Sequence, residues 1–133
     1  MLKDFLSWIK IKFNIHEYEK RPPFFNEREV WWSSFGQNIG DEENGKGDNF
    51  MRPVIVIRKF NKNICLVVPT SSQLKDNQYY FEIEYKNKQY SALLSHLRTI
   101  NTKRLKGKIA RLSMNDFEKL KGKILEVVFK AKN

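Results

Sequence analysis

An arginine and a cluster of hydroxyl side chains stand at the ends of two neighbouring apolar segments of this 133-residue chain. Arg52 opens the first segment, and Thr70, Ser71 and Ser72 close the second one. A guanidinium can donate two parallel hydrogen bonds to the oxygens of one phosphate. Hydroxyls can bind a phosphate or a ribose hydroxyl. These residue types therefore predict a site that handles a phosphate group without a metal ion.

Each of these residues also has a purely structural interpretation. An arginine at the end of a strand can form an ion pair with Glu42 or Glu43 of the preceding loop, and serines after a strand often cap a turn. No Gly-x-Ser-x-Gly segment surrounds Ser71 and Ser72, which disfavours the chemistry of serine hydrolases. Both interpretations stay open at this level.

The histidines and the cysteine carry little further chemistry. His96 could shuttle a proton near neutral pH, or it could be a structural residue among the leucines around it. His16 is the only other histidine, and neither has a partner at the spacing of metal ligands, so the sequence predicts no metal and no cofactor. Cys65 is the only cysteine. It lies in an apolar run and is expected to be a small core residue.

The charge is high and unevenly distributed. The formal net charge is +10 at pH 7. Residues 1–85 hold 12 basic and 12 acidic side chains, whereas residues 86–133 hold 13 basic and 3 acidic ones. This asymmetry favours a polyanionic partner, although a solubilising surface is the alternative. Arg98, Lys103 and Arg104 are among the basic residues expected to face such a partner.

The first residues predict an amphipathic helix over 2–19. Its apolar face is formed by Leu2, Phe5, Leu6, Ile9 and Phe13. We expect this face to pack on the rest of the protein or on a partner subunit, a membrane surface being the alternative. No stretch is apolar enough to span a bilayer or to act as a signal peptide, so a cytoplasmic protein is expected.

After a proline-containing connector the pattern changes to short strands. We expect residues 1–26 to form the helix and connector and residues 27–133 to form one barrel domain. Strands are predicted at 29–35, 52–60, 64–68, 78–85, 89–94 and 107–112, with a long loop at 37–51 and a capped helix after Ser113. Such strands indicate a small, strongly bent antiparallel barrel. Trp31 and Trp32 should point to opposite faces, so that one is core and the other is free to stack on a base or to pack at an interface.

Four segments in order resemble the MazF/PemK family of toxin ribonucleases over about residues 28–128. They are Glu29-Val-Trp-Trp32 through Gly40-Asp-Glu42, Arg52-Pro-Val-Ile-Val-Ile57, Val68-Pro-Thr-Ser-Ser72, and Leu93 to Asn101 through Arg104-Leu105. The resemblance implies an α+β, mainly β fold: a small SH3-like antiparallel barrel with a C-terminal helix, to which this chain adds an N-terminal helix. It also implies a homodimer that cuts single-stranded RNA without a metal, by attack of the 2′-hydroxyl on the adjacent phosphate, and a cognate antitoxin that fills the RNA channel.

The resemblance assigns roles to particular residues. Arg52 matches the catalytic arginine of the family, Ser71 its catalytic threonine, Ser72 the serine that follows, and Glu42 the loop glutamate. Ser95 stands where the family often has an acid, and His96 replaces the usual glutamine, so His96 could act as the base. The predicted catalytic residues are Arg52, Ser71 and His96. The predicted RNA-binding residues are Glu42, Thr70, Ser72, Arg98, Lys103 and Arg104.

The sequence therefore predicts a metal-independent endoribonuclease toxin. A non-catalytic RNA-binding module on the same barrel is the alternative that the missing acid favours. A third alternative is a toxin-like barrel that acts on a protein, since related barrels can inhibit DNA gyrase. The basic C-terminal third of the chain argues against this last alternative.

Overall fold

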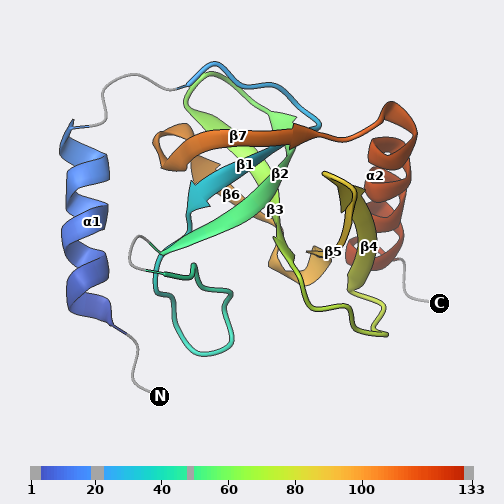
Figure 1. Cartoon of the computed structure of the whole chain (residues 1–133), viewed down its shortest axis with the longest axis horizontal. Coiled ribbons are helices and arrows are strands. Elements are labelled where there is room, and N and C mark those ends of the chain that lie inside the picture. The colour runs from blue at the N-terminus through green and yellow to red at the C-terminus, as the bar shows by residue number, and fades with distance from the viewer. Residues whose placement is uncertain (1–3, 19–22, 48–49, 131–133) are drawn as a thin grey trace.

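The computed structural model describes residues 4–18, 23–47 and 50–130, and it shows an α+β fold with one helix near each end of the chain (Figure 1). The elements in chain order are α1 (Phe5–Tyr18), β1 (Glu29–Ser34), β2 (Met51–Lys59), β3 (Ile64–Ser71), β4 (Tyr80–Tyr85), β5 (Lys88–Leu93), η1 (Leu94–His96), β6 (Arg98–Asn101), η2 (Thr102–Arg104), β7 (Leu105–Arg111) and α2 (Met114–Val128). This architecture confirms the predicted fold class.

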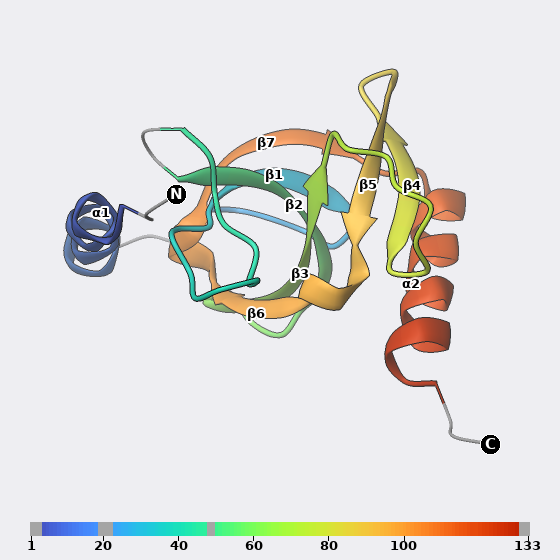
Figure 2. The ribbon, with the colours of Figure 1, turned by 90° about the horizontal axis from the view of Figure 1, so that it is seen from below.

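The strands form one bent antiparallel sheet in the order β4-β5-β3-β2-β1-β7, with β6 paired to β3. Viewed from below, β1, β2, β3, β6 and β7 curve around one interior, while β4 and β5 stand to one side with α2 (Figure 2). The strand β3 joins the two parts because it pairs with β2 and β6 and, at Thr70 and Ser71, with Ala92 and Ser91 of β5. The hydroxyl cluster thus lies where the sheet passes from its barrel part to the β4–β5 hairpin.

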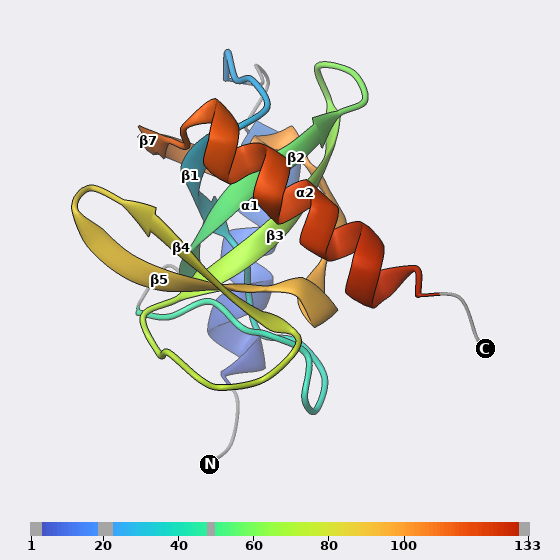
Figure 3. The ribbon, with the colours of Figure 1, turned by 90° about the vertical axis from the view of Figure 1, so that its right-hand side faces the viewer.

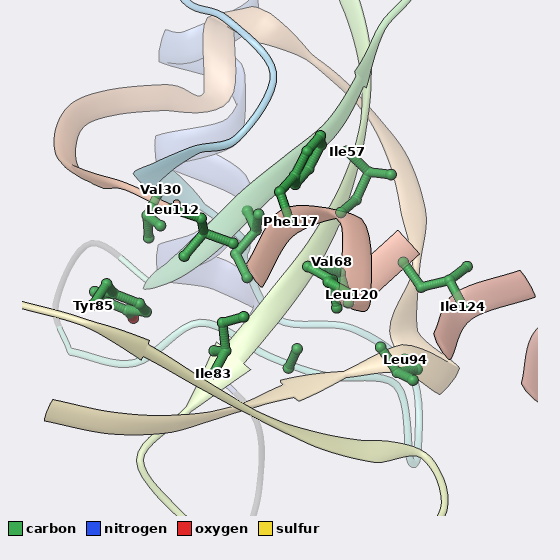
Figure 4. Close-up of a cluster of buried hydrophobic side chains, with 12 residues drawn as sticks. Val30, Ile57, Val68, Ile83, Tyr85, Leu94, Leu112, Phe117, Leu120 and Ile124 are labelled. Carbon is green, nitrogen blue, oxygen red and sulfur yellow. The ribbon is translucent and has the colours of Figure 1, made fainter. Parts of the chain in front are cut away.

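The strand β2 is buried on both faces, as its continuous apolar run predicts. Val54 and Val56 belong to the core inside the barrel, whereas Ile55 and Ile57 belong to the core between the sheet and α2. Figure 4 shows this second core, in which Val68 and Phe117 also take part. One strand therefore supports both cores.

The helix α2 lies across the outside of the sheet (Figure 3). Its start matches the prediction, since the Oγ of Ser113 accepts a hydrogen bond from the backbone N–H of Asp116 at 3.1 Å. Phe117, Leu120 and Ile124 are the buried residues of the helix. Their spacing of three and four residues puts one apolar face on the sheet.

The helix α1 contacts the barrel through a different face from the one expected. Trp8 is only 5% exposed, whereas Leu6, Ile9 and Phe13 are 79%, 57% and 56% exposed. The Trp8 ring meets Phe50 edge to face at 5.8 Å between ring centroids. The expectation that Leu6, Ile9 and Phe13 pack on the barrel is therefore wrong. The large indole of Trp8 makes the contact with the barrel instead. Leu2 and the predicted end at residue 19 lie outside the described residues.

A glycine makes this contact of α1 possible. Gly36 has a φ of +86°, and a Cβ at that position would overlap the Trp8 ring. Glycine adopts such a φ without a steric cost.

No helix among the described residues is long and apolar enough to cross a membrane.

Two short elements differ from the predicted pattern. The segment Arg98–Asn101 forms the strand β6, which the sequence did not predict, and β3 extends through Ser71 beyond the predicted end at residue 68. Pro69 lies within this strand, opposite Val54 of β2, and does not end it.

Cys65 is fully buried, which confirms it as a core residue. Burial raises the pKa of its thiol to about 12.

Candidate functional site

A cavity of about 530 Å³ opens where the start of β2 lies beside the end of β3. Arg52, Thr70, Ser71 and Ser72 all line it, so the structure brings together the arginine and the hydroxyl cluster that the sequence singled out. The other lining residues are Trp32, Lys46, Gly47, Met51, Pro53 and Tyr90. No group of three or more potential metal ligands occurs in the described part of the chain.

Strand register explains this meeting. In the β2–β3 pair Val54 lies opposite Pro69, so the first residues of β2 approach the last residues of β3. On its other side β2 pairs with β1, where Arg52 lies opposite Ser33. The ladder with β1 therefore holds the backbone of Arg52, and the ladder with β3 begins two residues later at Val54.

The guanidinium of Arg52 is held by three different groups. Its Nε donates to the carbonyl of Asn44 at 2.7 Å, its Nη1 donates to the carbonyl of Thr70 at 3.1 Å, and its Nη2 lies 2.6 Å from Oε1 of Glu43. Burial lowers the pKa of Arg52, and the charge of Glu43 opposes that shift. An arginine has five N–H donors, so two remain for a ligand in the cavity.

The ion pair of Arg52 answers a question that the sequence left open. Its partner is Glu43, whereas Glu42 accepts a hydrogen bond from the backbone N–H of Ile39 at 2.9 Å. Sequence reasoning considered Glu43 only as a structural partner. The geometry makes Glu43 the acidic group in direct contact with the arginine that lines the cavity.

The three hydroxyls differ in how accessible they are. Thr70 is 1% exposed, and its Oγ1 lies 2.9 Å from the phenol oxygen of Tyr85 and 3.3 Å from the carbonyl of Pro53. Ser71 is half-buried, and its Oγ accepts a hydrogen bond from the backbone N–H of Gln73 at 3.1 Å. Ser72 is exposed. Ser71 and Ser72 can therefore meet a ligand directly, whereas the hydroxyl of Thr70 is bonded inside the protein.

Aromatic side chains form part of the cavity wall. Trp31 is buried and donates its Nε1–H to Glu29 at 3.0 Å, whereas Trp32 is 45% exposed and lines the cavity. This arrangement confirms that the two tryptophans point to opposite faces. Tyr90 also lines the cavity, and its ring stacks on Tyr85 at 4.1 Å between centroids. The sequence offered one signal for Tyr85 and Tyr90, since aromatic residues on both strands of a hairpin often form cross-strand pairs.

A second cavity of about 330 Å³ holds other predicted residues. Glu42, His96 and Arg98 line it together with Phe35, Asn38, Glu43, Ser95 and Leu97. The guanidinium of Arg98 lies 5.0 Å from the centroid of the Phe35 ring, and burial lowers its pKa against the opposing charge of Glu42. His96 therefore lies in a different cavity from Arg52 and Ser71. Glu43 joins the two cavities, because it lines the second and contacts Arg52 of the first.

Lys103 and Arg104 lie in a third place, against α1. The Nζ of Lys103 donates to the carbonyl of His16 at 3.0 Å, and the Nη1 of Arg104 donates to the carbonyl of Ser34 at 3.1 Å. The sequence gave no indication that the helix would contact these two cations. The predicted RNA-binding residues are thus divided among three neighbouring parts of the molecule.

Comparison with models of protein families shows which family this chain resembles. Residues 26–128 match the model of the PemK-like, MazF-like toxins of type II toxin–antitoxin systems. The chain belongs to the PemK/MazF-like toxin family. The match confirms the resemblance that the sequence motifs indicated, and it leaves α1 outside the matched region. A comparison with curated proteins finds no match.

Solved structures show the same fold as this PemK/MazF-like chain. MazF from Deinococcus radiodurans is 16% identical, with a TM-score of 0.64 over 80% of this chain and 98% of that one. The Mycobacterium tuberculosis toxin MazF-mt6 is 12% identical, with a TM-score of 0.60 over 79% and 100% of the two chains. An endoribonuclease in complex with its cognate antitoxin, from a mycobacterial species, is 7% identical, with a TM-score of 0.60 over 83% and 100%.

Proposed function

We propose that this protein is a metal-independent endoribonuclease toxin that cuts single-stranded RNA and is neutralised by a cognate antitoxin. The observation that carries the proposal is the shared cavity of Arg52 and Ser71. These are the two positions that match the catalytic arginine and threonine of the family, and they lie 19 residues apart in the sequence. Membership of the PemK/MazF-like family supports the same conclusion.

The proposed reaction uses the RNA's own 2′-hydroxyl as the nucleophile. The bond between O2′ and phosphorus forms while the bond between phosphorus and O5′ breaks, which leaves a 2′,3′-cyclic phosphate and a 5′-hydroxyl. The 2′-hydroxyl loses its proton to a base, and the leaving O5′ gains a proton from solvent water or from the base once it is protonated. Negative charge grows on the phosphate oxygens, and the two remaining donors of Arg52 stabilise it. The hydroxyl of Ser71 donates a hydrogen bond to the same phosphate.

Two described groups can act as the base: Glu43, which contacts Arg52, and His96, which lies in the second cavity. Ser95 occupies the position where the family often has an acid, and a serine does not replace a carboxylate in proton transfer. His96 is next to Ser95 and lines the second cavity, and Glu43 lies between that cavity and Arg52. We propose His96 as the base and Glu43 as the residue that orients Arg52.

The cavity also suits the recognition of an unpaired base. Trp32 presents an exposed ring beside Arg52 and Ser71, and Tyr90, whose ring stacks on Tyr85, lines the same cavity. Single-stranded RNA is commonly held by stacking of bases on such rings. Paired bases in a helix do not offer their faces, so this arrangement favours single-stranded RNA as the substrate.

The proposed protein partners are a second copy of the chain and an antitoxin. A mycobacterial structural relative is solved with its cognate antitoxin. In this chain, 13 of the 25 basic residues lie in residues 86–133 with only 3 acidic ones, which favours an acidic antitoxin segment. Charge reversal at Arg98 should weaken RNA and antitoxin binding together. A monomer at micromolar concentration would contradict the dimer.

A non-catalytic RNA-binding module is the second candidate. Two observations favour it: the serine at position 95 and the three protein contacts that already engage Arg52. Such a module would bind single-stranded RNA in the same cavity and leave it intact.

One experiment separates these functions. The purified protein is incubated with a long, unstructured RNA in EDTA, and the ends of the products are mapped. We expect fragments with 5′-hydroxyl and 2′,3′-cyclic phosphate ends, and a Ser71→Ala variant that produces far fewer of them. RNA that is bound but uncut would establish the binding module, and RNA that is neither bound nor cut would exclude both functions.

A further inference from the structure

A third cavity, of about 230 Å³, lies between α1 and the segment that joins β6 to β7. Its volume is several times the roughly 30 Å³ share of one water molecule, so it admits a phosphate group. The lining residues are Trp8, Lys12, Ile15, His16, Asn101, Lys103 and Arg104. The helix α1 runs along the side of the barrel opposite α2 (Figure 1). It contributes four of the seven lining residues, from a region outside the family match.

The lining of this cavity is basic. Lys12, Lys103 and Arg104 carry positive charges, and none of the seven lining residues is acidic. Glu17 is a carboxylate that contacts a lining residue: it lies 3.9 Å from the Nε2 of His16 in an exposed pair. Glu17 does not itself line the cavity. Three cations around one concave space without a carboxylate favour an anionic ligand.

Arg104 is half-buried beside α1. Its guanidinium lies 5.7 Å from the centroid of the Trp8 ring. Burial and the nearby charge of Arg98 lower the pKa of Arg104 to about 10. Within the described residues no carboxylate forms an ion pair with it. A partly buried charge without an opposite charge is unfavourable, and a bound anion would supply that charge.

Contacts of Trp8 and His16 with the barrel place α1 so that Lys12 lies on the side of the helix that lines this cavity. Lys12 follows Trp8 by four residues and therefore lies on the same side of the helix. Trp8 is buried over Gly36 and against Phe50, and Lys103 donates a hydrogen bond to the carbonyl of His16. An ammonium has three N–H donors, so Lys103 keeps two for a ligand.

We propose that Lys12 of α1 forms a phosphate-binding site with Lys103 and Arg104, and that this site holds a phosphodiester of the RNA outside the cleavage cavity. The proposal rests on the proposed function, since it takes RNA as the ligand. Arg98 connects the sites, because its charge acts on Arg104 and it lines the cavity that Glu43 joins to Arg52. The helix outside the family region then lengthens the path that the RNA backbone follows.

The test compares two lysines of one helix. Both lysines are exposed, but Lys12 lines the cavity, whereas Lys10 lies two residues away and does not line it. The probe is a short single-stranded oligoribonucleotide with 2′-O-methyl groups, which cannot be cut by attack of the 2′-hydroxyl. Its affinity for wild type, Lys12→Ala and Lys10→Ala is measured by fluorescence anisotropy over a range of salt concentrations.

Lys12→Ala should weaken binding several-fold and reduce the slope of log affinity against log salt by about 0.7, the value for one lost contact to a single strand. Lys10→Ala should leave that slope unchanged. Lys12→Glu should weaken binding further than Lys10→Glu does. Thermal melting of each variant verifies that it is folded.

The outcomes separate this site from the proposed function. A wild type that binds the probe but cuts no RNA, with the expected loss in Lys12→Ala, would sustain the phosphate site and refute the nuclease. Equal salt slopes for Lys12→Ala and Lys10→Ala in a protein that cuts RNA would refute the site alone. A wild type that binds no single-stranded RNA would overturn both.

Discussion

The Oε1 of Glu43 lies 2.6 Å from the Nη2 of Arg52. An acid from the loop between β1 and β2 therefore holds the arginine of the cavity that Arg52 and Ser71 share. The same loop supplies the Asn44 carbonyl that accepts from the Nε of Arg52. The loop therefore fixes the orientation of the guanidinium as well as its charge partner. Substitutions of Arg52 and of Glu43 test the two sides of this contact.

Replacement of Arg52 by alanine should lower the rate of RNA cleavage by about a hundredfold or more, as expected for the loss of one preorganised donor. Arg52→Lys should remain strongly impaired, because an ammonium lacks the planar fork of a guanidinium. The measurement is kcat/KM on a defined single-stranded RNA. Arg58→Ala is the matched control, since Arg58 is an exposed arginine of the same strand. Cleavage by a folded Arg52→Ala protein at the wild-type rate would remove Arg52 from the mechanism.

Replacement of Glu43 by glutamine should reduce kcat by between about tenfold and a hundredfold, because a donor that shifts by about 1 Å loses its alignment with the phosphate. Loss of the charged partner should also lower the free energy of unfolding by about 1–3 kcal/mol, as for a hydrogen bond between charged groups. Denaturant titration measures the second effect. Glu42→Gln is the control, because Glu42 contacts the backbone of Ile39. Equal losses in the two variants would argue against a special role for Glu43.

If His96 is the base, the rate of cleavage should fall as the pH is lowered, because a protonated imidazole cannot accept another proton. The sign follows from the chemistry, since only a neutral imidazole accepts the proton of the 2′-hydroxyl. His96→Gln should be slower and should lose this dependence. The measurement is a pH–rate profile of each protein under single-turnover conditions. An unchanged profile in the variant would leave His96 with a structural role.

Trp8→Ala should destabilise the protein by about 3–5 kcal/mol, as for other buried tryptophans, whereas Leu6→Ala should change stability by less than about 0.5 kcal/mol because Leu6 is exposed. Thermal and denaturant unfolding measure both. Gly36→Ala gives an independent test, because its methyl group would overlap the Trp8 ring and its backbone φ disfavours alanine. A larger effect of Leu6→Ala than of Trp8→Ala would restore the packing expected from the sequence.

The sequence predicted those parts of the fold in which a local residue pattern is compatible with a single local structure. The run from Val54 to Ile57 is apolar at every position, and a strand buried on both faces is the structure it forms. The start of α2 has a local cause, since Ser113 needs only the backbone N–H three residues later. Arg52 and Ser71 could be placed together because the motifs of the family carry that information.

The contacts that the sequence did not predict depend on choices between similar surfaces. The helix α1 is apolar on two sides, with Trp8 and Ile15 on one and Leu6 and Ile9 on the other, so periodicity cannot say which side faces the barrel. Likewise, Glu42 and Glu43 are neighbours, and only the path of the loop decides which one reaches Arg52. The separation of His96 from Arg52 depends on that path as well.

The alternation of β2 between the two cores has a consequence for how this protein can change. Val54 faces one core, Ile55 faces the other, and Arg52 begins the same strand. Substitutions that loosen either core therefore also disturb the arginine, so β2 tolerates little variation. Trp32 and Ser72 are exposed at the cavity instead. Libraries that aim at a new RNA cleavage preference should diversify these two positions and leave β2 intact.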